Sequence, residues 1–158
     1  MTDSSLAWEI GAALSAQGLT LSVAESCTGG LLGDRISDVP GSSLYFTGGA
    51  ITYSYKAKER VLGVGHDTLV LHGAVSEETA REMARGARRL FETDISLAIT
   101  GIAGPDGGMP GKPVGLVYIA LAASDTELCR RFVWSDERRE NKAHSAEAAL
   151  RLLRDFLK

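Results

Sequence analysis

This sequence of 158 residues contains only two cysteines, Cys27 and Cys129, which stand far apart in the chain. A disulfide framework needs several cysteines, so the fold cannot depend on one. The first residues, MTDSSLAWEIGAALSAQG, include acidic residues and lack the basic segment of a secretory signal. We therefore predict reduced thiols and a cytoplasmic protein. A single domain, residues 1–158, is long enough to bury a core without disulfides or metals.

Long apolar runs and large blocks of charge are also missing. No segment reaches the roughly 18 apolar residues of a membrane span, so we expect no membrane partner. The formal net charge is −3, whereas nucleic-acid-binding domains usually have a basic surface, so we expect no nucleic-acid partner. The densest basic cluster is predicted to be mostly solvated surface that could hold one small anion: Arg130, Arg131, Arg138, Arg139 and Lys142.

Histidine is scarce, and the three histidines, His66, His72 and His144, are widely spaced. They form no HExxH pair, and the cysteines form no CxxC pair, which argues against a zinc site. We predict no metal ion and no other cofactor. We expect His66 and His72 in a loop-like stretch and His144 on a helix, each as a surface or capping residue.

The residues that are present alternate between helical and strand patterns. Helices are expected at residues 4–17, 28–36, 56–62, 76–91 and 138–158, and strands at residues 19–25, 44–54, 95–100, 114–122 and 128–134. Ser76 is the expected N-cap of its helix, and Gly48 and Gly49 indicate a bulge or a close approach. The last two strands form an expected hairpin. This order predicts an α/β fold, a three-layer α/β/α sandwich with a mixed five-stranded sheet.

The end of the first strand, Ala24-Glu25-Ser26-Cys27-Thr28-Gly29-Gly30, carries two hydroxyls and a thiol where a helix begins. Ligands of open α/β sheets bind beyond the carboxyl ends of strands. Unpaired backbone N–H groups at the helix start could polarise a carbonyl oxygen or hold a phosphate. The alternative is a simple N-cap at Ser26 or Thr28, since serine and threonine are preferred caps.

The segment after the third expected strand, Gly101–Pro113, is rich in glycine and proline. A loop of this length is often functional, and glycines let the backbone approach a ligand closely. Asp106 by itself is predicted to cap a turn of this loop.

A nucleophilic Ser26 needs a base. No GxSxG motif supports a Ser-His-Asp triad, although the pattern does not exclude one. Lysine is the other known partner of serine, and Lys56 and Lys58 follow the second strand. A lysine acts as a base near neutral pH only when burial or neighbouring cations lower its pKa. Taken alone, each lysine is expected to be a solvated helix residue.

Six segments together resemble the C-terminal domain family of the competence/damage-inducible protein CinA, and within it the stand-alone nicotinamide-nucleotide amidohydrolases. The matching segments are AESCTGG (24–30), PGSS (40–43), FxGGxxTYS (46–54), HGAVSEE (72–78), TGIAGPDGG (100–108) and KPVGLVY (112–118). The resemblance implies a three-layer α/β/α fold and hydrolysis of nicotinamide mononucleotide to nicotinic acid mononucleotide and ammonia. It also implies a homodimer. Longer CinA proteins carry an N-terminal pyrophosphatase domain, whose activity is not predicted here.

The resemblance assigns roles to individual residues. It makes Ser26 the nucleophile, Lys58 rather than Lys56 the base, and Tyr53 an aid to proton transfer or substrate positioning. Residues matched in the same segments are implied to bind the substrate: Cys27, Thr28, Gly29, Ser42, Gly49, Thr100, Gly101, Gly104 and Arg138, the last as a phosphate contact. The family often has Gly-Asp before that arginine and another arginine four residues after it. This chain has Asp136, Glu137 and Lys142 there, which bears on substrate affinity.

Three alternatives remain open at this stage. Cys27 could be the nucleophile, because a thiol at a helix N-terminus has a lowered pKa, although buried cysteines commonly serve packing alone. The domain could also be a non-enzymatic nucleotide-binding module linked to competence or DNA damage. It could finally hydrolyse another small amide.

Overall fold

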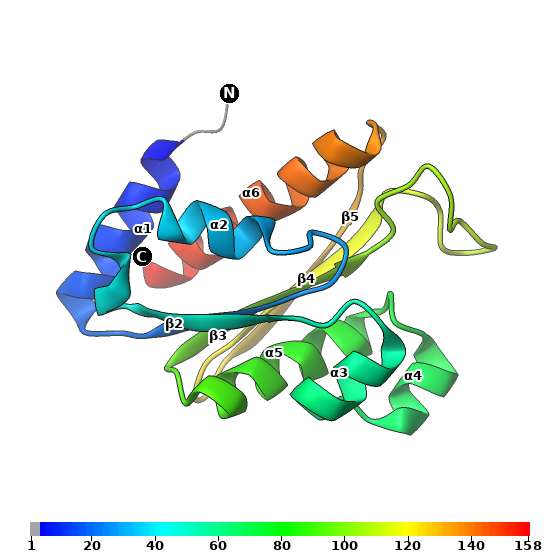
Figure 1. Cartoon of the computed structure of the whole chain (residues 1–158), viewed down its shortest axis with the longest axis horizontal. Helices are drawn as coiled ribbons and strands as arrows, with labels where there is room; N and C mark the ends of the chain where they lie inside the picture. Colours follow the sequence, from blue (N-terminus) through cyan, green and yellow to red (C-terminus); the bar gives the residue numbers. More distant parts are fainter. Residues whose placement is uncertain (1–3) are drawn as a thin grey trace.

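Five strands form one mixed sheet in the computed structural model, which describes residues 4–158, and the spatial order of the strands is β2-β1-β3-β4-β5 (Figure 1). The strands are β1 (Leu21–Glu25), β2 (Phe46–Ile51), β3 (Ile95–Gly101), β4 (Leu116–Ala122) and β5 (Glu127–Val133). β1 pairs in parallel with β2 and β3, whereas β4 is antiparallel to both β3 and β5. The predicted mixed sheet and its terminal hairpin are therefore confirmed.

Helices cover both faces of this sheet and complete the predicted three layers (Figure 1). One face carries α1 (Ser4–Gln17), α2 (Leu31–Ser37) and α6 (Arg138–Leu157), and the other carries α3 (Tyr55–Leu62), α4 (His66–His72) and α5 (Glu77–Phe91). A short 3-10 turn, Ser42–Leu44, precedes β2. No helix in the described part of the chain is both long and apolar enough to cross a membrane.

The two faces of the sheet bury different kinds of side chain. Leu97 and Ile99 of β3 pack with the α1, α2 and α6 layer, and Ala98 between them packs against α5. Small residues on that second face let α5 lie close to the strands. Every residue of β1 is buried, which is typical of a central strand covered on both sides.

Most element boundaries differ from the sequence predictions by one to three residues, and one helix was missed. Helix α4 occupies the stretch around His66 and His72 that the sequence predicted as a loop. It has only seven residues and no side-chain cap, so neither periodicity nor a capping residue marks it. Helix α2 begins at Leu31 rather than at Thr28. The N-cap role of Ser76 and the β2 irregularity beside Gly48 are both confirmed.

Candidate active site

The carboxyl ends of β1, β2 and β3 lie at the same edge of the sheet because these strands are parallel. A cavity of about 240 Å³ opens there. Its lining residues come from the segments after β1 and β2, the segment between α4 and α5, the end of β3 with the loop after it, and the first turns of α3 and α6. They are Ser26, Cys27, Tyr53, Lys58, Ala74, Val75, Thr100, Gly101, Ile102, Ala103, Gly104, Asp106, Gly107 and Arg138. This position agrees with the general location of ligand sites in open α/β sheets.

Lys58 is fully buried and contacts Ser26 directly. Its Nζ lies 2.9 Å from the Ser26 Oγ, 2.7 Å from the carbonyl oxygen of Thr52 and 3.4 Å from that of Tyr53. The Ser54 hydroxyl accepts a hydrogen bond from the Ala57 N–H at 3.1 Å, which fixes the start of α3 and so the place of Lys58. Burial lowers the pKa of Lys58 from 10.5 to about 8. A sizeable neutral fraction near physiological pH follows.

Cys27 lies beside this pair but has the properties of a packing thiol. Its side chain is 6% exposed, and burial raises the pKa of the thiol to about 11. The position of Cys27 before a helix predicts a lowered thiol pKa. This prediction is wrong, because the loss of solvation raises the pKa more than the backbone hydrogen bond lowers it. The thiol is protonated near neutral pH and is a poor nucleophile.

Glu25 holds this turn in place, a role that the sequence analysis did not single out. Its buried carboxylate accepts hydrogen bonds from the Thr28 hydroxyl at 2.6 Å and from the backbone N–H groups of Gly30, Leu32 and Gly33 at 3.3, 2.9 and 3.0 Å. The start of α2 is thus occupied by a carboxylate of the same chain and is not open to a ligand, contrary to the prediction.

Two other N–H groups of the turn lack a hydrogen-bond partner among the described residues, and of these two residues Cys27 lines the cavity. In the described part of the chain, the N–H groups of Cys27 and Thr28 donate to no other residue. By contrast, the Ser26 N–H donates to the Ile99 carbonyl at 3.0 Å. The free pair precedes α2 and adjoins the Ser26 hydroxyl in sequence, where an oxyanion of an attacked carbonyl would need donors.

Arg138 ties together two sides of the cavity. Its Nη1 donates to the Gly104 carbonyl at 2.7 Å, and its Nη2 donates to the Tyr53 hydroxyl at 2.9 Å. The Tyr53 hydroxyl therefore contacts Arg138, while only the Tyr53 carbonyl reaches Lys58. The buried Asn141, one turn further along α6, donates to the Ala103 carbonyl at 3.0 Å. Helix α6 thus anchors the loop that follows β3.

Thr100, Gly101 and Gly104 line the cavity, and each also has a packing reason. The Thr100 hydroxyl donates to the Ala74 carbonyl at 2.7 Å, which holds the segment before α5. A Cβ on Gly101 would lie 2.8 Å from the Leu116 carbonyl oxygen, and Gly104 has a φ of 89°. Both positions therefore require glycine.

Four residues with an implied substrate contact do not line this cavity. Thr28 bonds to Glu25, and Gly49 lies beside β1, where a Cβ would approach the Val23 side chain to 2.6 Å. Ser42 precedes β2 and so lies at the opposite edge of the sheet from Ser26. Gly29 lies in the turn itself, and a Cβ there would be 3.7 Å from the Lys142 Nζ. Lys142, which stands where the family often has an arginine, therefore lies beside the turn after Ser26.

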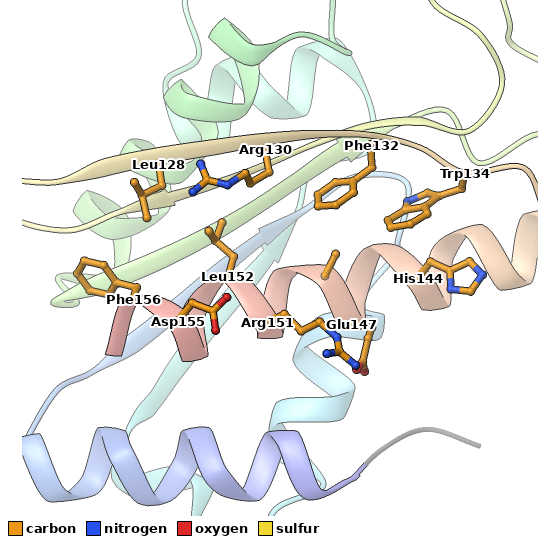
Figure 2. Close-up of a pocket in the computed structure, with 11 residues that line it drawn as sticks. Leu128, Arg130, Phe132, Trp134, His144, Glu147, Arg151, Leu152, Asp155 and Phe156 are labelled. Carbon is orange, nitrogen blue, oxygen red and sulfur yellow. The ribbon is translucent and has the colours of Figure 1, made fainter. Parts of the chain in front are cut away.

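A larger cavity of about 720 Å³ lies elsewhere, between β5 and α6. Figure 2 shows apolar side chains such as Leu128, Phe132 and Leu152 along it, with the charged Arg151 and Asp155 also lining it. Its lining, within the described chain, includes no serine, cysteine or lysine. The chemistry predicted from the sequence therefore gathers in the smaller cavity. Residues 4–158 also contain no group of three His, Cys, Asp or Glu side chains placed to hold a metal ion.

Comparison with known families matches residues 3–157 to the CinA C-terminal domain. A CinA-like protein of Syntrophus aciditrophicus is 52% identical over 157 residues, which cover 98% of this chain and 37% of the relative. A CinA-like protein of Chloroherpeton thalassium is 49% identical and is covered over 38% of its length. The chain therefore spans less than two fifths of the length of these curated relatives.

Solved structures of similar length have the same fold. The competence/damage inducible protein CihA from Agrobacterium tumefaciens superposes with a TM-score of 0.96 at 39% identity, over 98% of this chain and 95% of that protein. The competence damage-inducible protein A from Klebsiella pneumoniae superposes with a TM-score of 0.94 at 35% identity, over 96% and 94%.

Proposed function

Because this chain belongs to the CinA C-terminal domain family, we propose that it is an amidohydrolase that acts on nicotinamide mononucleotide. Water and the carboxamide react to give nicotinic acid mononucleotide and ammonia, a step of pyridine nucleotide salvage. The observation that carries the proposal is the 2.9 Å contact between the buried Lys58 Nζ and the Ser26 Oγ. A serine nucleophile needs an adjacent base that can take the proton of its hydroxyl, and the buried Lys58 amine is placed to do so.

The surroundings of Lys58 support its role as the base. A neutral amine has two N–H groups, which can donate to the Thr52 and Tyr53 carbonyls, so that its lone pair is directed to the Ser26 hydroxyl. With a pKa of about 8, about a tenth of the lysine is neutral at pH 7. The same carbonyls then accept hydrogen bonds from the ammonium form after proton transfer.

The proposed reaction has two halves. Lys58 takes the proton of Ser26 while the Ser26 Oγ bonds to the carboxamide carbon, and the N–H groups of Cys27 and Thr28 stabilise the oxyanion. Each such donor is typically worth about 3–4 kcal/mol. Lys58 then gives its proton to the leaving nitrogen, and ammonia departs. In the second half, water attacks the acyl-serine, Lys58 accepts its proton, and the Ser26 hydroxyl is restored as the acid leaves.

The charges around the cavity support a phosphorylated pyridinium substrate. Arg138 lines the cavity, and the Lys142 Nζ lies beside Gly29, so two cations stand where a phosphate could bind. The positive ring of the substrate also favours the neutral form of Lys58 by repulsion of like charges. A cavity of only about 240 Å³ suits the pyridinium ring of the substrate. The phosphate would then lie outside the cavity, near α6.

The assembly and the place of action are also proposals. On the basis of the family resemblance, we propose a cytoplasmic homodimer that needs no cofactor. Sedimentation of the purified protein tests the dimer, and a single monomeric species at micromolar concentration would contradict it.

The deciding experiment measures ammonia release from nicotinamide mononucleotide by purified protein treated with a chelator, beside Ser26→Ala and Lys58→Ala. Activity in the parent chain and loss in both variants is the expected result. Nucleotide binding without ammonia release would favour a non-enzymatic binding module instead. Ammonia release from a different amide alone would keep the chemistry and change the substrate.

A further inference from the structure

Asp106 is a feature of the cavity that the proposed mechanism does not use. It belongs to the loop between β3 and β4, and it is the one carboxylate among the described residues that line the cavity. Its side chain is exposed, so it adjoins both the cavity and the solvent. Two basic side chains, Lys58 and Arg138, also line the cavity.

The loop does not depend on the Asp106 carboxylate for its own structure. Arg138 holds the Gly104 carbonyl, and Met109 and Lys112 exchange two backbone hydrogen bonds of 2.9 Å. Within residues 4–158, Asp106 makes neither a hydrogen bond nor an ion pair. The prediction that Asp106 caps a turn is therefore wrong. A carboxylate with no structural contact at a cavity is available to a ligand.

Arg138, one of the two cations of the lining, makes its hydrogen bonds to groups other than this carboxylate. The Arg138 guanidinium is directed to the Gly104 carbonyl and the Tyr53 hydroxyl. The Asp106 charge consequently acts on whatever enters the cavity, where water is partly excluded and charge interactions are stronger than in bulk solvent. Lys142 stands beside the turn at Gly29 and does not line the cavity. The site thus combines one negative charge, Asp106, with the cations Lys58 and Arg138 in the cavity lining, and Lys142 lies outside that lining.

We propose that Asp106 recognises the positive charge of the substrate ring, so that the site selects N-substituted pyridinium amides over neutral aromatic amides. This inference rests on the proposed function, because it assigns a substrate class to the same cavity. A ligand with a cationic ring and an anionic phosphate matches the two signs of charge. Removal of one partly exposed charge near a bound cation is expected to weaken binding about five- to tenfold.

A matched pair of ligands separates charge from shape. Nicotinamide mononucleotide has a positive ring nitrogen, whereas the C-nucleotide of benzamide has a neutral ring carbon at that position and the same carboxamide, ribose and phosphate. Dissociation constants of both ligands are measured by calorimetry in the Ser26→Ala chain, where no turnover occurs, and in the same chain with Asp106→Asn. Asp125→Asn serves as the control, because Asp125 lies in the β4–β5 turn at the other edge of the sheet.

With Asp106→Asn, the affinity for nicotinamide mononucleotide is expected to fall about five- to tenfold. The affinity for the neutral ligand is expected to change less than about twofold. Asp106→Glu, which keeps the charge, is expected to recover part of the loss, and Asp125→Asn is expected to change neither ligand. Equal effects on both ligands, or none, would overturn the proposal. So would an Asp106→Asn variant of the active chain that lowers kcat while binding is unchanged, since that indicates a role in the chemistry.

Ammonia release by the chain with Ser26 intact decides the proposed function separately. Charge-selective binding without turnover would disprove the amidohydrolase and keep the role of Asp106. Turnover without charge-selective binding would do the reverse. Thermal unfolding of Asp106→Asn verifies that the variant is folded, which its lack of structural contacts leads us to expect.

Discussion

The Lys58 Nζ and the Ser26 Oγ lie 2.9 Å apart, although the two residues are separated by 32 positions in the sequence. Lys56, only two positions away, is exposed and takes no part in this contact. About half a turn of helix therefore separates a solvated lysine from a buried one. Burial lowers the pKa of Lys58 to about 8, which suits a base.

The first prediction separates the two candidate nucleophiles. Ser26→Ala is expected to lower kcat at least about a thousandfold, because the attacking oxygen is removed. Cys27→Ala is expected to stay within about tenfold of the parent activity, because its thiol is buried and has a pKa of about 11. Steady-state ammonia release measures both. Loss of activity in Cys27→Ala, with Ser26→Ala still active, would instead identify Cys27 as the nucleophile.

The second prediction concerns the pH dependence of activity. The reactive form of Lys58 is the neutral amine, so kcat/KM is expected to rise about tenfold per pH unit below pH 8 and to level off above it. Lys58→Arg is expected to be inactive at every pH, since a guanidinium does not lose its proton in this range. A profile that is flat between pH 6 and 9 would contradict the role of Lys58 as the base.

The third prediction concerns stability. The pKa of Lys58 is about 8 in the folded protein and near 10.5 in the unfolded chain, so the unfolded chain binds more protons between these values. The free energy of unfolding therefore rises with pH across this window, by about 3 kcal/mol at most from this residue. The Lys58→Met variant is expected to lack this rise of the unfolding free energy with pH. Urea unfolding of both proteins at pH 7, 9 and 10.5 measures it, and parallel pH profiles would argue against a buried, shifted lysine.

The sequence predicted the layers, the mixed sheet and the last hairpin because strand length, strand composition and the Ser76 cap are local signals. It did not predict the role of Glu25. A glutamate at the end of a strand is indistinguishable in sequence from a solvated one, and its hydrogen bonds to Leu32 and Gly33 exist only once the turn has folded. The resemblance supplied the choice of Lys58 over Lys56, which neither pattern nor composition could make.

The fourth prediction tests Glu25 as the residue that holds the turn after Ser26. Glu25→Gln keeps the shape but replaces one accepting oxygen by a donor that faces backbone N–H groups. It is expected to destabilise the protein by about 1–3 kcal/mol and to lower kcat, because the turn carries the Cys27 and Thr28 donors. Thermal unfolding and ammonia release are measured together. Thr28→Ser, which keeps the hydroxyl that bonds Glu25, is the conservative control, and an unchanged melting temperature for Glu25→Gln would refute this role.

The fifth prediction assigns Lys142 to the phosphate. Lys142→Met is expected to raise KM for nicotinamide mononucleotide about five- to twentyfold and to leave kcat near the parent value, because the Nζ lies beside Gly29 outside the reacting group. Hydrolysis of nicotinamide riboside, which lacks the phosphate, is expected to be unaffected. Arg139→Met removes an exposed charge from the same helix and serves as the control. A similar loss for the riboside would contradict a phosphate contact.

Ser42 and Gly49, for which the resemblance implies a substrate contact, do not line the cavity, and the topology and packing of the sheet explain their positions. Motif matching treats every position of a shared segment alike, yet Ser42 lies at the far edge of the sheet and Gly49 is explained by contact with Val23. A matched position can thus reflect packing of the backbone rather than contact with a substrate. Only the topology of β1, β2 and β3 separates the residues at the carboxyl edge from the others.

The anchoring of the β3–β4 loop by α6 sets an order of events during protein synthesis. A ribosome makes Ser26, Lys58 and the loop before it makes Arg138 and Asn141, which hold the carbonyls of Gly104 and Ala103. A nascent chain that already contains Ser26 and Lys58 therefore has a loop without its anchors. In the proposed hydrolase, the cavity is therefore complete only after α6 has docked against the β3–β4 loop.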